Sequence, residues 1–312
     1  MTSTSKPIVW KEKERLDGEI VGCLTAILRT RGCRWDRCYM CGYTSDAYPA
    51  SEEELIQQVD YVFEQLEDES VLKIFTSGSF FDDAEVPPKV RGYLLEKFQQ
   101  RGLKKLIVES RPEYITDERI EPFKGVNLEV GIGLETASDR VRELCINKGF
   151  SFEDFKDAAT KLRNYGFRVK CYLLLKPPFL SESEAIDDAI KSIVAAKPYA
   201  DLFSLNLTNV QKGTLVERLW KAKLYRPPWL WSAVEVLREA KAIGVEILSD
   251  PVAAGKQRGP HNCGKCDAEV AAAIREFSLT QDTSKLEGLH CECIEKWKKA
   301  VELEKYSRAP LF

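Results

Sequence analysis

The chain has 312 residues, of which 44% are hydrophobic and 30% charged, so it can bury a full-sized core. Its formal net charge of −3 excludes a strongly basic surface, and any RNA contact would need local patches or a partner. No stretch approaches the roughly 20 apolar residues of a membrane span, and residues 1–9 lack a signal-peptide core, so we expect a cytoplasmic protein without membrane contact.

Strands and helices alternate along the first 250 residues. The pattern predicts strands over residues 19–30, 71–76, 105–109, 127–134, 167–175, 201–207 and 245–248. It predicts helices over residues 51–66, 89–100, 138–145, 151–164, 181–196 and 232–243, with a short one after Thr116. Ser51 with Glu54, and Ser181 with Glu184, are typical of capping boxes. Such alternation favours parallel βαβ units in a partial (β/α) barrel, with a doubly wound α/β sheet as the alternative.

After residue 250 the alternation of strands and helices gives way to a loop-like segment that contains cysteines. We therefore predict a barrel domain over residues 1–250 and a Cys-rich metal-binding extension over residues 251–312. Four thiolates fit a closed tetrahedral zinc site of the structural kind, although His290 could replace one ligand and an auxiliary iron–sulfur cluster is an alternative. The four thiols belong to Cys263, Cys266, Cys291 and Cys293. Cys145 and Cys171 have no such neighbours and are expected in the core.

A second cysteine group lies in the loop of residues 31–43, directly after the first predicted strand. Cys33, Cys38 and Cys41 are separated by four and then two residues. Thiolates are the usual ligands of iron–sulfur clusters, and three of them leave one iron of a 4Fe–4S cluster open. A zinc knuckle or unligated thiols would also be compatible with the spacing.

The loop resembles the cluster motif of the radical S-adenosylmethionine (SAM) superfamily, whose commonest form has one residue fewer between the first two cysteines. The resemblance implies that SAM chelates the open iron. Met40 stands where the superfamily has an aromatic residue beside the adenine, and Tyr39 precedes it. The segment TSGSFFD after the second predicted strand resembles the Gly-rich segment that meets the SAM amino group, which implies SAM contacts for Ser77, Gly78 and Ser79.

Three further segments extend this resemblance. ESRPEYIT resembles the ETRPD-type segment of the Elongator catalytic subunit and its relatives, which implies that Glu109 and Arg111 face the barrel interior, where they could pair with each other or with SAM. GIGLETASDRVREL resembles the strand-to-helix segment that carries Glu135, and from which Arg142 could reach the SAM carboxylate. Active sites of barrels collect at the carboxyl ends of strands. The candidates for substrate chemistry there are Glu135, Lys176 and Asn206.

Over nearly its full length, from the cysteine loop through ESRPEY and GLET to PHNCGKCD, the chain resembles the radical SAM subunits of archaeosine synthase. The resemblance implies a lyase that breaks the lysine Cε–N bond of lysine-modified 7-deazaguanine in the tRNA D-loop. It also implies a partner subunit that attaches the lysine, and an electron donor. The alternatives are a radical SAM enzyme of tRNA thiolation or methylthiolation, and a noncatalytic zinc scaffold that binds RNA.

Overall fold

The computed structural model describes residues 6–312, which fall into two compact units. The first unit contains the residues up to Asp36 together with Tyr43–Gly133 and Glu153–Lys170. The second contains Arg37–Gly42, Leu134–Phe152 and Cys171–Phe312. The Cys-rich tail thus belongs to the same unit as the strands that precede it, and the domain boundary at residue 250 stays a prediction.

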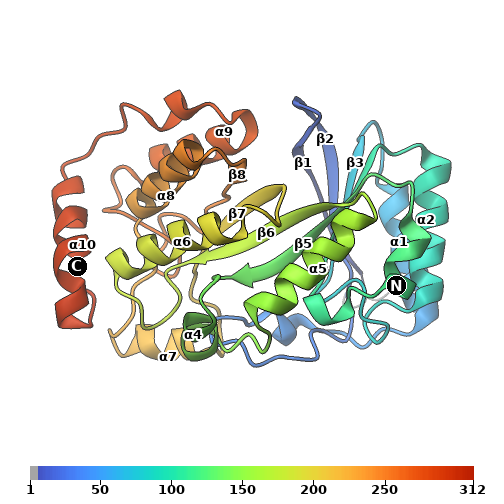
Figure 1. Cartoon of the computed structure of the whole chain (residues 1–312), viewed down its shortest axis with the longest axis horizontal. Coiled ribbons are helices and arrows are strands. Elements are labelled where there is room, and N and C mark those ends of the chain that lie inside the picture. Colours follow the sequence, from blue (N-terminus) through green and yellow to red (C-terminus); the bar gives the residue numbers. More distant parts are fainter. Residues whose placement is uncertain (1–5) are drawn as a thin grey trace. The chain divides into compact units, whose positions relative to one another are not determined.

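The eight strands of the described chain form one sheet in which they follow one another in sequence order (Figure 1). A doubly wound sheet would reverse its strand order at a switch point, so this order favours the predicted partial (β/α) barrel. The β2–β3, β3–β4, β4–β5 and β7–β8 pairs are parallel. The strands are β1 (Ile8–Leu16), β2 (Glu19–Ile27), β3 (Val71–Phe75), β4 (Lys105–Glu109), β5 (Leu128–Glu135), β6 (Arg168–Leu175), β7 (Leu202–Leu207) and β8 (Ile247–Leu248).

Strand β1 was not predicted. It pairs antiparallel with β2, from Ile8 opposite Ile27 to Leu16 opposite Glu19. Its many charged residues suit a sheet edge and conceal the alternation expected of a strand. The local signal is the Asp17-Gly18 turn, because both residues have positive φ angles, as a two-residue hairpin requires.

The predicted helices are present, and both capping boxes are confirmed. None of the helices in residues 6–312 combines the length and apolar character that crossing a membrane requires. The first unit carries α1 (Glu52–Glu64), α2 (Pro88–Arg101), α3 (Asp117–Ile120) and α5 (Phe152–Asn164). The second carries α4 (Asp139–Val141), the π-helical turn η4 (Arg142–Ile146), α6 (Glu182–Ala196), α7 (Leu215–Lys221), α8 (Leu230–Ile243), α9 (Asp267–Thr280) and α10 (Ile294–Ser307).

A charged cluster lies within the core of the first unit. The Glu129 carboxylate on β5 is fully buried and accepts ion pairs from Lys105 Nζ at 2.8 Å and Lys170 Nζ at 2.6 Å. Burial works to raise the pKa of Glu129, but the ammonium groups of Lys170 and Lys105 outweigh it and hold the pKa at about 2. The Glu129 carboxylate is therefore ionised at neutral pH and paired with two buried ammonium groups.

We expect Glu129→Gln to lower the free energy of unfolding by about 3–5 kcal/mol at pH 7, since it removes the carboxylate with which two buried ammonium groups pair. The folded-state pKa lies below the usual 4.5, so this contribution is complete above pH 4.5 and is lost as the pH falls from 4.5 toward 2. Urea unfolding at several pH values measures both effects. Glu153→Gln, which breaks the exposed Lys156–Glu153 pair, is the control and should cost under about 1 kcal/mol.

Candidate functional site

The Gly-rich segment after β3 lies directly against the start of the cysteine loop, within the first unit. A Cβ atom on Gly78 would stand 2.7 Å from the Cα atom of Cys33 and 1.9 Å from Glu85 Oε1. Glu85 is buried and accepts hydrogen bonds from Ser79 N at 2.7 Å and Thr30 Oγ1 at 2.9 Å. Burial raises the pKa of the Glu85 carboxyl above its ordinary value. This carboxyl fixes the Gly-rich segment beside Cys33.

We expect Gly78→Ala to weaken SAM binding at least tenfold, because the added methyl group must push the segment away from Cys33 or from Glu85. Isothermal titration of the iron-loaded protein with SAM measures the change. Gly92→Ala is the matched control, since its Cβ would meet nothing within 4 Å on the exposed side of α2. Unchanged SAM affinity in Gly78→Ala would remove this segment from the cofactor site.

The other two loop cysteines belong to the second unit, where they form one tight turn. Cys41 N donates to Cys38 O at 3.2 Å, and both thiols are half-buried. Gly42 N donates to the Gln211 side chain at 2.5 Å, and a Cβ on Gly42 would stand 2.9 Å from Lys212 O. The turn is thus held against the segment that follows β7. Cys33, also half-buried, lies in the first unit.

The two residues between these cysteines are fixed by different means. Tyr39 N donates to Ile146 O at 2.9 Å, and Tyr39 O accepts from Val216 N at 3.3 Å. The Met40 side chain packs on an apolar cluster that includes Val210 and Val216. Their contacts with the adenine of SAM stay predictions.

At the end of β4, Arg111 is brought beside the Gly-rich segment. Its backbone N donates to Ser79 Oγ at 3.1 Å, and its buried guanidinium pairs with Glu113 Oε1 at 2.5 Å. Glu109, half-buried, ends the strand. The ion pair between Arg111 and Glu113 was not predicted from the sequence.

At the end of β5, Glu135 is largely buried, has a φ of +66° and pairs with Lys148 Nζ at 2.6 Å. Arg142 is almost completely buried. Its guanidinium donates to Thr136 O, to Phe150 O and to the Asp139 carboxylate. These bonds brace the turn after β5, and a direct contact with the SAM carboxylate stays a prediction.

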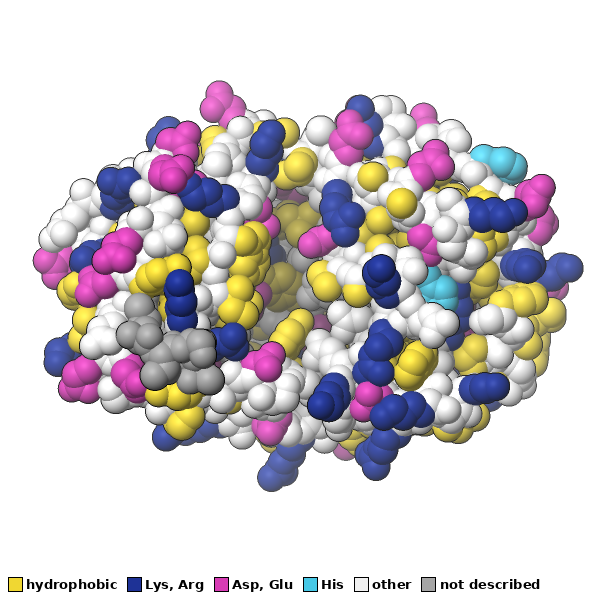
Figure 2. Space-filling model, turned by 180° about the vertical axis from the view of Figure 1, so that it is seen from behind, with side chains coloured by type: hydrophobic (Ala, Val, Ile, Leu, Met, Phe, Trp, Pro, Cys, Tyr) yellow, Lys and Arg dark blue, Asp and Glu magenta, His cyan; other side chains and the backbone are white. Residues whose placement is uncertain are grey.

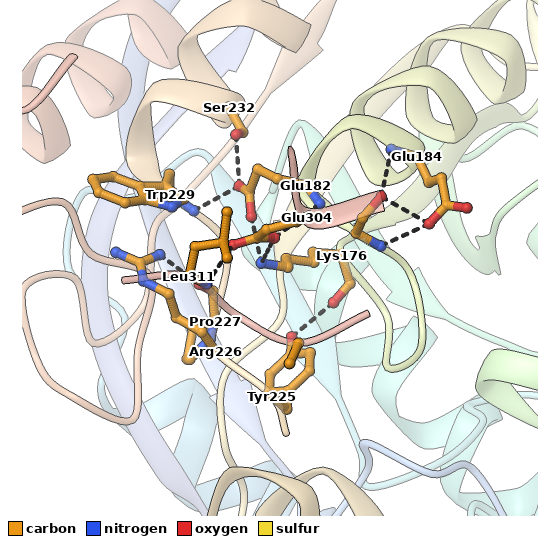
Figure 3. Close-up of polar contacts among 12 residues, drawn as sticks. Lys176, Glu182, Glu184, Tyr225, Arg226, Pro227, Trp229, Ser232, Glu304 and Leu311 are labelled. Atoms are coloured by element: carbon orange, nitrogen blue, oxygen red, sulfur yellow. Dashed lines mark hydrogen bonds and ion pairs between the residues drawn. The ribbon is translucent and has the colours of Figure 1, made fainter. Parts of the chain in front are cut away.

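Lys176 follows β6 with a φ of +57° and lies in a buried polar cluster (Figure 3). Its Nζ is 2.5 Å from Glu182 Oε2 and 3.4 Å from Glu304 Oε2 of α10. Glu182 also accepts hydrogen bonds from Ser232 Oγ at 2.6 Å and Trp229 N at 2.8 Å. Lys176 is therefore firmly positioned by two carboxylates, which sequence reasoning missed. The third candidate, Asn206, is exposed on β7.

The tail cysteines form a compact group that could hold a metal ion, and all four sulfur atoms lie within 4.8 Å of one another. A tetrahedral ion with metal–sulfur bonds of about 2.3 Å requires sulfur–sulfur distances of about 3.8 Å. The observed distances are 4.0 Å for Cys263–Cys266 and 3.7 Å for both Cys263–Cys291 and Cys266–Cys293. The donor set therefore fits one tetrahedral ion. His290 is exposed and does not belong to the described group.

Neighbouring donors support these sulfur atoms. Trp231 Nε1 donates to Cys293 Sγ and Asn262 Nδ2 to Cys266 Sγ, both at 3.3 Å. Helix α9 begins directly after Cys266, and α10 begins directly after Cys293. The site thus ties together the starts of two helices, and such outer contacts orient ligands and tune their basicity.

Comparison with known proteins agrees with this architecture. Residues 27–193 match the Radical SAM superfamily, so the chain belongs to it. Elp3 of Methanocaldococcus infernus, a solved structure, shares the fold at a TM-score of 0.53 and 18% identity, over 78% of this chain and 61% of that one. The queuine lyase of Clostridium spiroforme, solved with SAM and queuine bound, shares the fold at a TM-score of 0.51 and 22% identity. The match covers 68% of this chain and 86% of that one.

Two relatives that match over nearly their whole length identify the family within the radical SAM superfamily. Archaeosine synthase subunit beta of Methanosarcina acetivorans is 46% identical, over 97% of this chain and 92% of the relative. The subunit beta of Thermococcus kodakarensis is 43% identical, over 94% of this chain and 96% of the relative. The chain therefore belongs to the archaeosine synthase subunit beta family.

Proposed function

We propose that this chain is the radical SAM lyase of archaeosine synthesis, which breaks the Cε–N bond of a lysine attached to 7-deazaguanine in the tRNA D-loop and leaves the nitrogen on the base. The observation that supports this most is the identity of 43–46% to two archaeosine synthase beta subunits over nearly the whole chain.

The loop cysteines Cys33, Cys38 and Cys41 would hold the 4Fe–4S cluster. With SAM, such a cluster supplies one-electron chemistry that can activate an unactivated carbon–hydrogen bond, where acid–base catalysis would fail. The missing Cβ of Gly78 leaves room for a close backbone approach beside Cys33, which fits a cofactor that must bind at the cluster. Glu85 would keep that surface in place, and Arg111 would support it through Ser79.

The roles of the strand-end residues differ in this proposal. Lys176 and Glu135 already have charged partners within 2.6 Å, so each would act as part of a pair, with Glu182 and Lys148 respectively. Asn206 is exposed and could donate or accept a hydrogen bond to substrate directly. The tail would hold one structural zinc ion through four thiolates.

The remaining parts of the reaction would come from other molecules. A partner subunit would attach lysine to the base before this chain acts, and a separate reductant would deliver the electron. The word "subunit" in the names of both relatives supports a partner. The chain's net charge of −3 suggests that this partner supplies part of the tRNA affinity.

The test is anaerobic reconstitution, followed by incubation with SAM, dithionite and lysine-modified tRNA, with nucleosides and 5′-deoxyadenosine read by mass spectrometry. Archaeosine formed together with 5′-deoxyadenosine is the expected result. SAM cleavage without archaeosine would keep the enzyme class and reject the substrate. A colourless protein that cleaves no SAM would reject both.

A further inference from the structure

A cavity of about 380 Å³, wide open to solvent, lies in the first unit at the start of the cysteine loop. Arg34 and Trp35, the two residues that follow Cys33, line one part of it. Glu113, Tyr114 and Arg119, from the segment after β4, line the other. A cavity of this volume is in the range that holds a nucleoside-sized ligand. None of these five residues is a proposed cluster ligand or part of the Gly-rich segment.

Carboxylates hold the two arginines in fixed orientations, a buried one in the case of Arg34 and a partly exposed one in the case of Arg119. The Arg34 guanidinium makes two hydrogen bonds of 2.7 Å to Asp82, whose side chain is fully buried, while half of the Arg34 side chain stays exposed. Arg119 Nε and Nη2 bond Asp83 Oδ2 at 3.1 and 2.6 Å, and Arg91 pairs with the same carboxylate at 2.8 Å. The arginines therefore present pre-oriented planes to the cavity without a large excess of positive charge.

These planes lie next to aromatic rings. The Arg34 guanidinium lies 5.0 Å from the centre of the Tyr114 ring, and that of Arg119 lies 5.9 Å from it. Arg111 stands over Trp35 at 5.4 Å. Unstacked RNA bases bind by stacking on aromatic rings or on guanidinium planes. Because the Arg34 and Arg119 guanidinium groups already pair with Asp82 and Asp83, stacking suits this cavity better than binding of a phosphate alone.

Glu113 gives the cavity an acceptor of hydrogen bonds. Its Oε1 accepts from Arg111 Nε at 2.5 Å, and the side chain is 42% exposed. A carboxylate has about four acceptor positions, so Glu113 can still accept from N–H groups on a base. Among the bases, guanine offers two adjacent donors, N1–H and the N2 amino group, on one edge. The acceptor therefore favours guanine.

On the face shown in Figure 2, the described residues form no extended positive patch that could bind RNA by charge alone. Lys and Arg side chains are interspersed there with Asp and Glu, and neither sign covers the face alone. We propose that the cavity lined by Arg34, Trp35, Glu113, Tyr114 and Arg119 binds an unstacked base of the substrate tRNA, preferentially guanine. This rests on the proposed function, because it takes the substrate to be tRNA.

The experiment measures binding of lysine-modified tRNA to the reconstituted protein by fluorescence anisotropy at several salt concentrations. Tyr114→Ala should weaken binding about tenfold, the loss expected for one stacked base, without changing the slope of log Kd against log salt concentration. Tyr306→Ala, at a highly exposed tyrosine of α10, should change nothing. Iron content and far-ultraviolet circular dichroism must match the wild type in both variants.

Two further measurements separate the possible outcomes. Ultraviolet crosslinking should join the peptide with Trp35 or Tyr114 to a guanosine of the tRNA. Glu113→Gln should reduce the preference for guanosine, while the neighbouring exposed Glu118→Gln should not. The proposal would be overturned if Tyr114→Ala bound tRNA with unchanged affinity and the crosslinks lay elsewhere. It would also be overturned if Tyr114→Ala lost affinity only for the lysine-attaching partner and not for tRNA. Absence of archaeosine with wild-type protein would instead count against the proposed reaction, since tRNA binding is measured separately.

Discussion

A Cys38→Ser variant is expected to hold no stable 4Fe–4S cluster and to form no 5′-deoxyadenosine from SAM above background. A serine hydroxyl is a poor iron ligand at neutral pH, whereas thiolates are the usual ones. Cys38 also begins the turn that Cys41 N closes, so the change removes a ligand without removing the hydrogen bond to the Cys38 backbone. Iron analysis, electron paramagnetic resonance and mass spectrometry of the reaction measure the loss.

Cys171→Ala is the matched control for this experiment. Its thiol is completely buried on β6, and burial raises its pKa well above the ordinary value, which keeps it protonated and unsuited to iron. The control should retain wild-type iron content. Normal iron and normal SAM cleavage in Cys38→Ser would show that the loop is not the cluster site.

A Cys266→Ser variant is expected to lose the tail metal and to lower the Tm by about 10 °C, which corresponds to about 4 kcal/mol in a unit of this size. Cys266 is buried and directly precedes α9, so its loss would also release the start of α10, which the ion would hold through Cys293. Inductively coupled plasma mass spectrometry and thermal unfolding measure the two effects. One zinc ion per chain is expected in the wild type.

His290→Ala is the control for the tail site, because His290 is exposed beside Cys291 and does not belong to the four-thiol group. It should retain its metal and its Tm. Metal loss in His290→Ala but not in Cys266→Ser would mean that the ligand set is wrong. Iron in place of zinc, with visible absorption, would keep the site and change the metal.

The sequence was sufficient for most of the barrel because its helices carry local start signals. Ser51 with Glu54 and Ser181 with Glu184 form capping boxes in the structure, as their spacing predicts. Strand β1 was missed because its charged residues disguise an edge strand, although the Asp-Gly turn after it is a local signal.

The candidate sites were predictable only where their residues are close in sequence. The four tail cysteines form two short pairs, and the structure brings the pairs together as expected. Glu304 could not be assigned to Lys176, because 128 residues separate them and no local pattern links α10 to the end of β6. The partnership of Glu85 with Ser79 depends on how the loop after β3 folds back, which the spacing does not encode.

The tail site also has an electrostatic consequence. A divalent ion with four thiolates carries a net charge of −2, which is costly to hold near an apolar core. Helices α9 and α10 begin directly after the proposed ligands Cys266 and Cys293, so the positive ends of two helix dipoles lie at the sulfur atoms. The two helices thereby act as built-in counter-ions, and loading the ion strengthens the start of each.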